Sequence, residues 1–376
     1  MFMVSVSFLI FLIGETLTQL CSSTLALAAS TSMVTAIPQE TVAAIPNSNI
    51  APNVNTQPNP SDTTLPNSGY PSSTLCALSN DMQHLWNLRK DSVVKVMGIE
   101  NGNSDKAQEI FCTGFFADHE GHVLTTATIT TRAETLWIEY QRLCYMAILV
   151  GKDTATNLAV IKLIKKPEQL TPILLSKAQD IPIFSEGHLV MAIGCALGME
   201  PTPTWGMITG QNIVFEDHIF VTTYLRSNIN IYGGESGAPV FGSNGDLCGI
   251  LIASLPELHS SLIIPKRALE RIFNDIVHNK GVKYCTAGFS VRARMSAPGK
   301  KEFLISAIDE QKIKCLGTEI LKVGDIIRMI EKRPIEKEGD IADILFFKHP
   351  NEPLSITVLR NEKPLTVTII LSEKKI

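Results

Sequence analysis

The sequence predicts a mainly β protein with two folded domains, and three observations carry this prediction. About 300 residues follow a segment of low apolar content, which is enough chain for two domains. Apolar and polar residues alternate over 354–358 and again over 365–369, the pattern of two antiparallel strands joined by a turn at 360–363. A helical segment starting at Lys266, with apolar residues spaced i, i+3, i+4, i+7 and i+8, has Pro265 before it and Gly281 after it and divides the two domains.

Residues 1–29 have the features of a signal peptide or a membrane anchor. Residues 2–13 are apolar, and Ala26-Leu27-Ala28 provides small residues for cleavage before Ala29. No lysine or arginine precedes the apolar stretch and Glu15 follows it, so retention as an N-terminal membrane tether is the alternative to cleavage. Either outcome predicts an exported chain, in the periplasm or elsewhere in the cell envelope.

Residues 30–75 form a linker. Seven prolines are interleaved with asparagine, serine and threonine, and only Glu40 and Asp62 carry a charge. Such a segment has too few apolar side chains to form a core, so it is predicted to be extended and disordered. It would separate the folded part of the chain from a membrane or an assembly partner.

The composition argues against several kinds of ligand. The net charge is −4 without a basic run, so no nucleic acid is expected as a partner. Seven cysteines follow the signal region without a Cys-x-x-Cys pair or a zinc spacing, so no metal or other cofactor is expected. His119 and His122 lie on a glycine-containing turn, which favours a solvated turn over a metal site. Cys195 and Cys248 are the candidates for a disulfide.

Residues 233–239 read Gly-Gly-Glu-Ser-Gly-Ala-Pro and are followed by Val-Phe, the start of a strand. A serine held between glycines can expose its hydroxyl as a nucleophile. The backbone N–H groups of Gly234 and Ser236 would then donate to a developing oxyanion. The loop resembles the nucleophile loop of trypsin-like serine proteases, with Ser236 at the nucleophile position.

Over about residues 78–374 the chain resembles the HtrA/Deg family of exported proteases, and the landmarks occur in family order: Asp91–Val96, Cys112–Phe115, Gly121–Thr130, Gly151–Lys162, Ala192–Gly198, Gly206–Gly210 and Ile263–Pro265. The resemblance implies a trypsin-like double β-barrel, two six-stranded antiparallel barrels over about 90–265, in a protease-fold domain at 78–281. A PDZ domain at 284–374 would follow. The resemblance also implies a homo-oligomer, a trimer formed through the protease domain.

Two of the three catalytic positions hold residues that cannot perform the chemistry of this family. Alignment on Leu124-Thr125 places Thr128 at the general-base histidine and Asn157 at the aspartate that orients it. Threonine has no group that titrates near neutral pH, and losing the base slows such proteases on the order of 10⁶-fold. His122 is predicted to lie about 20 Å from Thr128 on the same strand, too far to replace the base. The alternative is a displaced alignment in which another histidine folds into place.

The second domain resembles a PDZ domain at two motifs. Val323–Ile327 is similar to the Gly-Asp-x-Ile strand entry of that fold. Ala287-Gly288-Phe289 resembles the loop whose backbone N–H groups receive the terminal carboxylate of a peptide, while the peptide adds a strand to the sheet. The alternative is an ordinary turn before a strand. A short predicted helix would offer an apolar pocket for the last side chain of the peptide, formed by Ile341, Ile344 and Leu345.

The sequence leaves two functions open. The first is an exported, catalytically inactive scaffold or regulator, whose PDZ domain binds unfolded or C-terminal peptides of envelope proteins. The second is an active HtrA-type serine endopeptidase in envelope protein quality control. The residues at positions 128 and 157 favour the first.

Overall fold

The computed structural model describes residues 74–100, 108–175, 184–215, 218–297, 300–337 and 339–374, all within a single compact unit of the chain. The predicted signal peptide or anchor and nearly all of the predicted linker lie outside these residues. Among the described residues, no helix has both the length and the apolar character needed to span a membrane.

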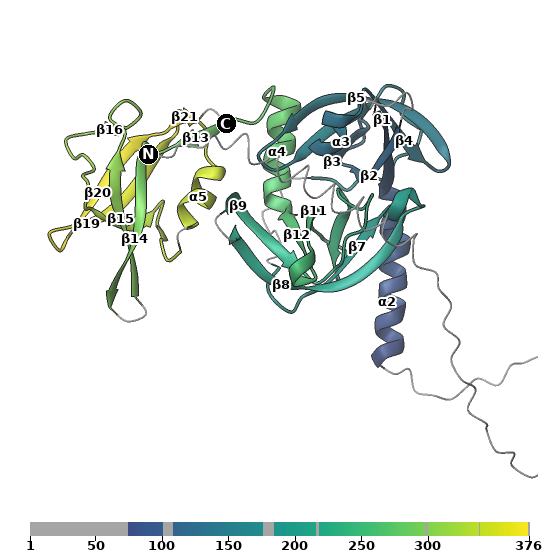
Figure 1. Cartoon of the computed structure of the whole chain (residues 1–376), viewed down its shortest axis with the longest axis horizontal. Coiled ribbons are helices and arrows are strands. Elements are labelled where there is room, and N and C mark those ends of the chain that lie inside the picture. Colours follow the sequence, from purple (N-terminus) through teal and green to yellow (C-terminus); the bar gives the residue numbers. More distant parts are fainter. Residues whose placement is uncertain are drawn as a thin grey trace, which may run out of the picture. The chain divides into compact units, whose positions relative to one another are not determined.

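The first β-barrel closes six antiparallel strands in the order β1-β2-β3-β6-β5-β4 (Figure 1). Its strands are β1 (Val93–Glu100), β2 (Gln108–Phe116), β3 (His122–Thr126), β4 (Thr135–Tyr140), β5 (Leu143–Asp153) and β6 (Leu158–Leu163). Side chains from all six strands fill the interior, among them the fully buried Val96, Ile138 and Ile161. Burial of these apolar side chains is the main stabilising contribution to the barrel.

The second β-barrel closes six more strands in the order β10-β11-β12-β9-β8-β7. Its strands are β7 (Leu189–Gly194), β8 (Thr202–Phe215), β9 (His218–Ser227), β10 (Pro239–Gly242), β11 (Leu247–Leu255) and β12 (Ser260–Pro265). Val190, Ile208 and Val240 are fully buried in its interior. Two consecutive six-stranded barrels confirm the predicted trypsin-like double barrel.

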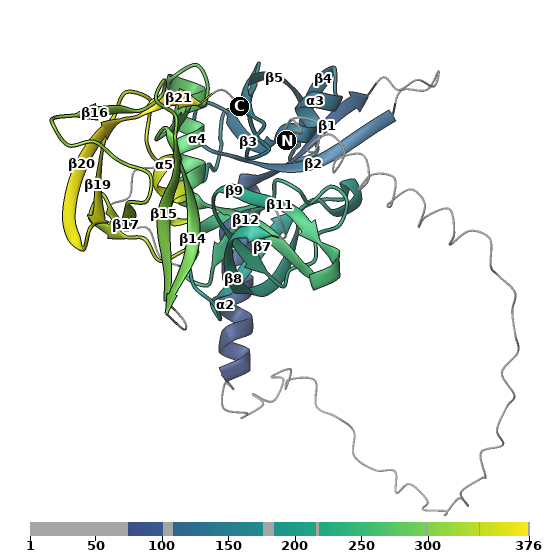
Figure 2. The same cartoon turned by 60° about the vertical axis from the view of Figure 1, so that its left-hand side comes forward.

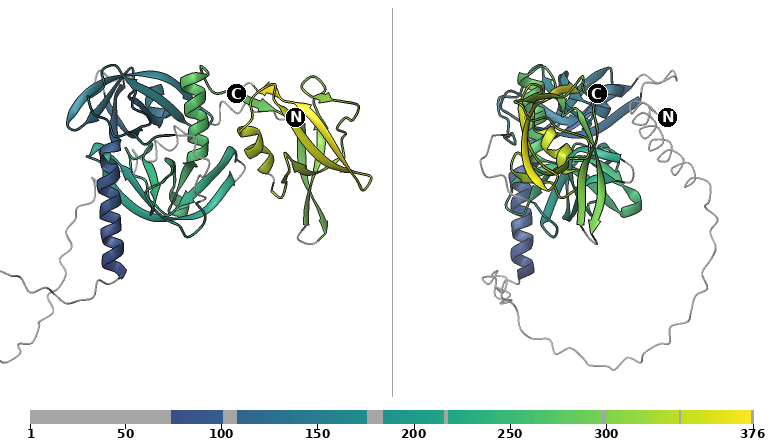
Figure 3. Two further views of the ribbon diagram at one scale, coloured as in Figure 1. Left: turned by 180° about the vertical axis from the view of Figure 1, so that it is seen from behind. Right: turned by 90° about the vertical axis from the view of Figure 1, so that its left-hand side faces the viewer.

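Helix α4 (Lys266–His278) confirms the helix predicted from the apolar spacing and ends three residues before Gly281. It packs against β5 and β6 of the first barrel and against β11 and β12 of the second (Figure 3). Leu269, Ile272 and Ile276 carry that contact and are buried. The remaining helical elements of the barrel region are α2 (Thr74–Arg89), the 3₁₀ turns at Lys90–Ser92, Ala196–Gly198 and Pro256–Leu258, and α3 (Ala127–Arg132).

The C-terminal domain has a core of its own and is built on a sheet with the order β14-β15-β17-β19-β20-β16 (Figure 2). Its strands are β14 (Phe289–Ala297), β15 (Lys300–Ile308), β16 (Lys314–Leu316), β17 (Ile326–Ile330), β18 (Arg333–Pro334), β19 (Pro353–Arg360) and β20 (Lys363–Ile370). Strand β18 pairs with β17, β13 (Tyr284–Thr286) pairs with β21 (Ser372–Lys374), and α5 is Asp340–Phe346. The predicted hairpin is present, with Arg360 opposite Lys363 and the two turn residues at positive φ.

The disulfide considered between Cys195 and Cys248 is absent, because both residues have free thiols. Cys195 lies where the two barrels meet, and its amide donates to Thr113 Oγ1 at 2.9 Å. Cys248 instead packs in the interior of the second barrel. Burial raises the pKa of both thiols to about 12, so neither forms a reactive thiolate near neutral pH.

Candidate active site and peptide-binding edge

The loop between β9 and β10 presents Ser236 half-buried between two glycines in left-handed conformations. Gly234 and Gly237 both have φ of +94°. A Cβ atom at Gly234 would clash with the Cys195 carbonyl oxygen, and one at Gly237 would clash with the Thr113 carbonyl oxygen. Both positions therefore require glycine for the fold itself.

Thr113 on β2 of the first barrel holds this loop in place. Its amide donates to the Ser236 carbonyl oxygen at 3.0 Å, and its hydroxyl donates to the Gly234 carbonyl oxygen at 2.8 Å. The same hydroxyl accepts a hydrogen bond from the Cys195 amide, and Thr113 is fully buried. No role was predicted for Thr113 from the sequence, although it lies inside one of the landmark segments. The sequence did contain a signal for this role, because Thr113 is a small polar residue within a segment predicted to be a buried strand.

The backbone donors predicted for an oxyanion are not engaged. Neither the Gly234 amide nor the Ser236 amide donates a hydrogen bond to any other residue that the structure describes. Between them, the Glu235 side chain turns inward, is 5% exposed, and accepts a hydrogen bond from the Tyr232 amide at 2.7 Å. Burial raises the pKa of the Glu235 carboxyl, and the Tyr232 hydrogen bond opposes that shift. That these two amides bind a developing oxyanion stays a prediction.

Thr128 and Asn157 are in direct contact. Asn157 Oδ1 accepts two hydrogen bonds of 2.9 Å from Thr128, one from its hydroxyl and one from its amide. Asn157 has φ of +56°, and its carbonyl oxygen accepts a hydrogen bond from the Ala127 amide at 2.9 Å. The two residues aligned with the base and its orienting carboxylate are therefore paired by a hydroxyl and an amide, and neither group can take up a proton near neutral pH.

Thr128 does not lie on the same strand as His122, so that prediction was wrong. Strand β3 ends at Thr126, and Thr128 is the second residue of α3. Three residues before it, Thr125 donates to the Thr113 carbonyl oxygen at 2.8 Å, and Thr113 contacts the nucleophile loop. That Thr128 and Asn157 face Ser236 across a cleft stays a prediction.

His122 has partners away from the nucleophile loop. Its Nδ1 lies 2.6 Å from Asp118 Oδ2, and its ring packs edge-on against Phe273 of α4, with 6.0 Å between ring centroids. Among the residues that the structure describes, no hydrogen bond joins an imidazole to Ser236 Oγ. No cluster of histidine, cysteine, aspartate or glutamate in that part of the chain could hold a metal ion.

In the C-terminal domain, the predicted peptide loop leads into an edge strand. Gly288 has φ of +73°, and a Cβ atom there would lie 2.8 Å from the Ile313 amide nitrogen. Its amide donates to Thr286 Oγ1 at 3.3 Å and its carbonyl oxygen accepts from the Asp309 amide at 2.8 Å. Ala287 is buried, and strand β14, which begins at Phe289, lies at one end of the sheet order. That edge can accept a further strand.

The three apolar residues predicted to form a pocket lie on α5 and are partly buried. They pack against the same core as Phe289 and Val291 of β14. The loop, the edge strand and the helix are thus grouped around one apolar cluster, which includes Ile341, Ile344 and Leu345.

Comparison with known proteins agrees with both folds. Residues 112–250 match the family model of the trypsin-like peptidase domain, and residues 307–371 match that of the PDZ domain. Among solved structures, the chain is similar to the HtrA-type protease AlgW with tripeptide, with a TM-score of 0.64 and 19% identity. That similarity covers 78% of this chain and 97% of the AlgW chain.

Curated relatives belong to the same group of proteases. A probable periplasmic serine endoprotease DegP-like of Marinomonas sp. (strain MWYL1) is 24% identical over 277 residues, 70% of this chain and 57% of that protein. The serine endoprotease DegS of Escherichia coli (strain K12) is 23% identical over 288 residues, 73% of this chain and 80% of that protein. The chain therefore spans less than two thirds of the DegP-like relative and most of DegS.

Proposed function

We propose that this chain, which joins a trypsin-like peptidase domain to a PDZ domain as HtrA-type proteases do, is a catalytically inactive peptide-binding protein of the cell envelope. The observation that carries the proposal is the pairing of Thr128 with Asn157. The positions aligned with the base and its carboxylate hold a hydroxyl and an amide, and the hydroxyl donates a hydrogen bond to the amide oxygen.

A serine hydroxyl attacks a peptide bond only when a base removes its proton during the attack. The Thr128 hydroxyl cannot act as that base near neutral pH. The free amides of Gly234 and Ser236 could still stabilise an oxyanion, which leaves about 10³–10⁴-fold acceleration over water. That residual acceleration is far below what a protease needs.

The surface left to act is the peptide-receiving edge of the PDZ domain. An incoming peptide would pair with β14, place its last side chain near Ile341, Ile344 and Leu345, and direct its carboxylate to the loop at Ala287-Gly288-Phe289. The ligands proposed are unfolded or C-terminal peptides of envelope proteins, and the bound forms of AlgW support peptide recognition as the mode. A scaffold or regulator in envelope protein quality control would use such recognition without hydrolysis.

Location and assembly are part of the same proposal. The apolar residues 2–13 and the periplasmic relatives support export to the periplasm or envelope. Whether residues 1–29 are removed or kept as a membrane tether is decided by N-terminal sequencing of the protein purified from cells. A homotrimer is proposed by resemblance and is tested by the mass in solution.

The inactive state is tested with the wild type and Ser236→Ala side by side. Both should leave casein intact and both should fail to react with a fluorophosphonate probe. Casein cleavage by the wild type that the Ser236→Ala substitution abolishes would overturn the proposal. It would establish the second function, an active endopeptidase, which the free Gly234 and Ser236 amides favour.

Peptide binding is tested on the full chain with a free-acid peptide that ends in a hydrophobic residue and with its amidated form. We expect a Kd on the order of micromolar for the free acid. Amidation should weaken binding at least about tenfold, because charge-assisted hydrogen bonds to the carboxylate are lost. Gly288→Glu should abolish binding, with its melting temperature recorded because Gly288 has positive φ. Equal affinity for the two peptides would exclude carboxylate capture.

A further inference from the structure

The free edge strand of the PDZ domain carries arginine side chains on one face. Strand β14 lies at one end of the sheet, and β14 and β15 extend past the other strands (Figure 1). Successive side chains of a strand point to opposite faces of its sheet. Phe289 and Val291 pack against the core that includes α5. Arg292 and Arg294 therefore lie on the opposite face, which we call the outer face, and both are exposed.

The two arginines of β14 differ in what they contact. Arg294 Nη2 lies 3.1 Å from Glu302 Oε2, and Arg328 Nη2 lies 2.9 Å from Glu302 Oε1, so each oxygen of this carboxylate already has a cation. The Arg292 guanidinium has no hydrogen bond or ion pair with any residue that the structure describes. Three arginines thus share one carboxylate, and the outer face beside Arg292 has a positive charge without a partner.

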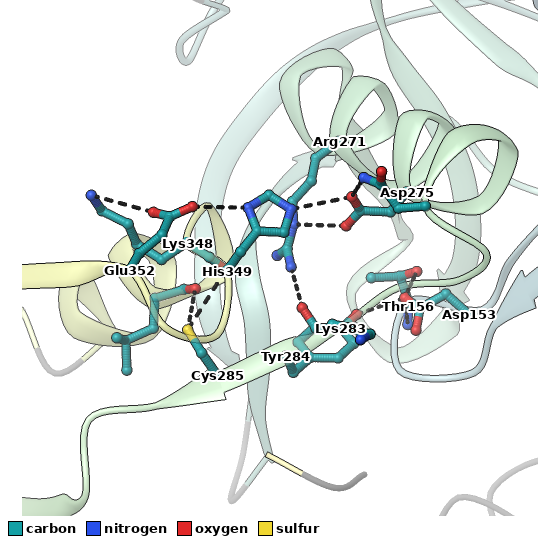
Figure 4. Close-up of polar contacts among 12 residues, drawn as sticks. Asp153, Thr156, Arg271, Asp275, Lys283, Tyr284, Cys285, Lys348, His349 and Glu352 are labelled. Atoms are coloured by element: carbon teal, nitrogen blue, oxygen red, sulfur yellow. Dashed lines mark hydrogen bonds and ion pairs between the residues drawn. The ribbon is translucent and has the colours of Figure 1, made fainter. Parts of the chain in front are cut away.

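Contacts around the strand before the peptide loop fix that loop relative to α5 (Figure 4). The Cys285 thiol of β13 donates to the carbonyl oxygens of Leu345 at 3.3 Å and Lys348 at 3.6 Å. The segment after α5 is held in turn by His349, whose Nε2 lies 3.2 Å from Asp275 Oδ1 on α4. A peptide whose carboxylate lies in the loop after β13 would therefore have one register along β14.

That register places a particular peptide side chain beside Arg292. The loop precedes β14 in the chain, so a bound peptide would run antiparallel to this strand. With the last peptide residue beside Phe289, the residue two before it lies beside Val291, and the residue three before it lies beside Arg292. Directly opposite residues of antiparallel strands share a face of the sheet, with Cβ atoms about 4.5–5.5 Å apart. The residue three before the last would then lie on the outer face, within reach of the guanidinium.

We infer that Arg292 makes the PDZ domain selective for peptides that carry aspartate or glutamate three residues before an apolar C-terminal residue. The inference rests on the peptide binding proposed for the same edge and adds the class of peptide bound. A carboxylate at that position would accept charge-assisted hydrogen bonds from a guanidinium that has no competing partner. Lysine at that position would bring two like charges together. Arg294 contributes less, because Glu302 already pairs with it.

The test measures Kd of the full chain for three free-acid peptides that differ only in this residue, which is Glu, Gln or Lys. The Glu peptide should bind about threefold more tightly than the Gln peptide, and the Lys peptide about threefold more weakly, the size of one exposed cross-strand charge pair. The resulting preference for Glu over Lys, about tenfold at low ionic strength, should fall to about twofold in about 0.5 M salt, because salt screens exposed charges.

Three variants make the test specific. Arg292→Gln should bind the three peptides with affinities within about twofold of one another, and Arg292→Glu should prefer the Lys peptide. Lys301→Gln is the matched control, because it removes one charge from an exposed residue that pairs with Met295 on the other face of the same hairpin. It should keep the preference of the wild type. The uncharged Gln peptide should bind all four proteins alike, which shows that the variants are folded.

The outcomes separate this inference from the proposed function. Binding of the Glu and Lys peptides to the wild type with equal affinity would overturn the inference and leave peptide binding in place. A preference that Arg292→Gln keeps unchanged would overturn the inference as well. Failure of all three peptides to bind would overturn both the inference and the peptide-binding function.

Discussion

The nucleophile loop and the Thr128–Asn157 pair are the two halves of one predicted site. They differ in how far each half has the groups that catalysis in this fold requires. The loop has glycines at positive φ, a buried threonine that braces it, and two amides, of Gly234 and Ser236, that donate to no other residue the structure describes. The pair retains a short side-chain contact without any titratable group. Backbone geometry in the loop is required by packing against Thr113 and Cys195, so the fold preserves it whether or not the site works.

The side chain at position 128 is under no comparable constraint. Thr128 is exposed, and the contact it makes with Asn157 can be made by other polar residues. On the proposal that this chain lacks its base, we expect the loss to have cost the fold little stability. A nucleophile-like loop is for the same reason weak evidence for catalysis in this fold.

The largest effect should come from placing a side chain in the loop. Gly237→Ala combines positive φ with a clash against the Thr113 carbonyl oxygen. We expect it to lower the free energy of unfolding by at least about 3 kcal/mol. Gly187→Ala is the matched control, since Gly187 has φ of +88° with nothing within 4 Å of a Cβ atom, and should cost about 1 kcal/mol. Equal losses in urea denaturation would show that the clash is relieved.

The next effect should come from the residue that braces the loop. Thr113→Val removes a hydroxyl that donates to the Gly234 carbonyl oxygen and accepts from the Cys195 amide, and leaves both groups buried. We expect a loss of about 2 kcal/mol, because a buried polar group without a partner loses its solvation. A loss in the free energy of unfolding smaller than that of a Thr→Val substitution at an exposed position would contradict this. It would mean that water or a shifted loop takes over the hydrogen bonds of the hydroxyl.

The smallest effect should come from the same substitution at the other half of the site. Thr128→Val removes one hydrogen bond to Asn157 at an exposed position, while the Thr128 amide still donates to the same oxygen. We expect the free energy of unfolding to fall by no more than about 0.5 kcal/mol. A loss as large as that of Thr113→Val would contradict the view that this pair is free to change.

Much of the fold could be predicted from local patterns. The helix at Lys266–His278 and the hairpin at residues 353–370 follow from apolar spacing and turn residues, which act over short distances along the chain. The double barrel was predicted from ordered motifs, because its strands pair across long separations that periodicity alone does not specify. The end of β3 was misplaced, since Thr126 to Thr128 are all compatible with a strand.

The candidate sites were predicted unevenly. The loop glycines, Ser236 and the loop at Gly288 were found because glycine is required where a chain turns or another backbone approaches closely. The role of Thr113 and the contact of His349 with Asp275 were not found. Each depends on residues 74 or more positions apart in sequence, and no local pattern reports such a contact. The prediction of a Cys195–Cys248 disulfide was wrong for the same reason. Cys195 lies beside Thr113 of the first barrel, and Cys248 packs inside the second barrel.

The central claim is that the nucleophile loop is intact and only the base is missing. The most direct test is Ser236-dependent cleavage of casein by the wild type and by the double variant Thr128→His, Asn157→Asp, each measured against its own Ser236→Ala form. A missing base predicts no Ser236-dependent cleavage in the wild type and a rate at least about 10²-fold above background in the double variant. A wild type that cleaves casein through Ser236 as fast as the double variant would contradict the account.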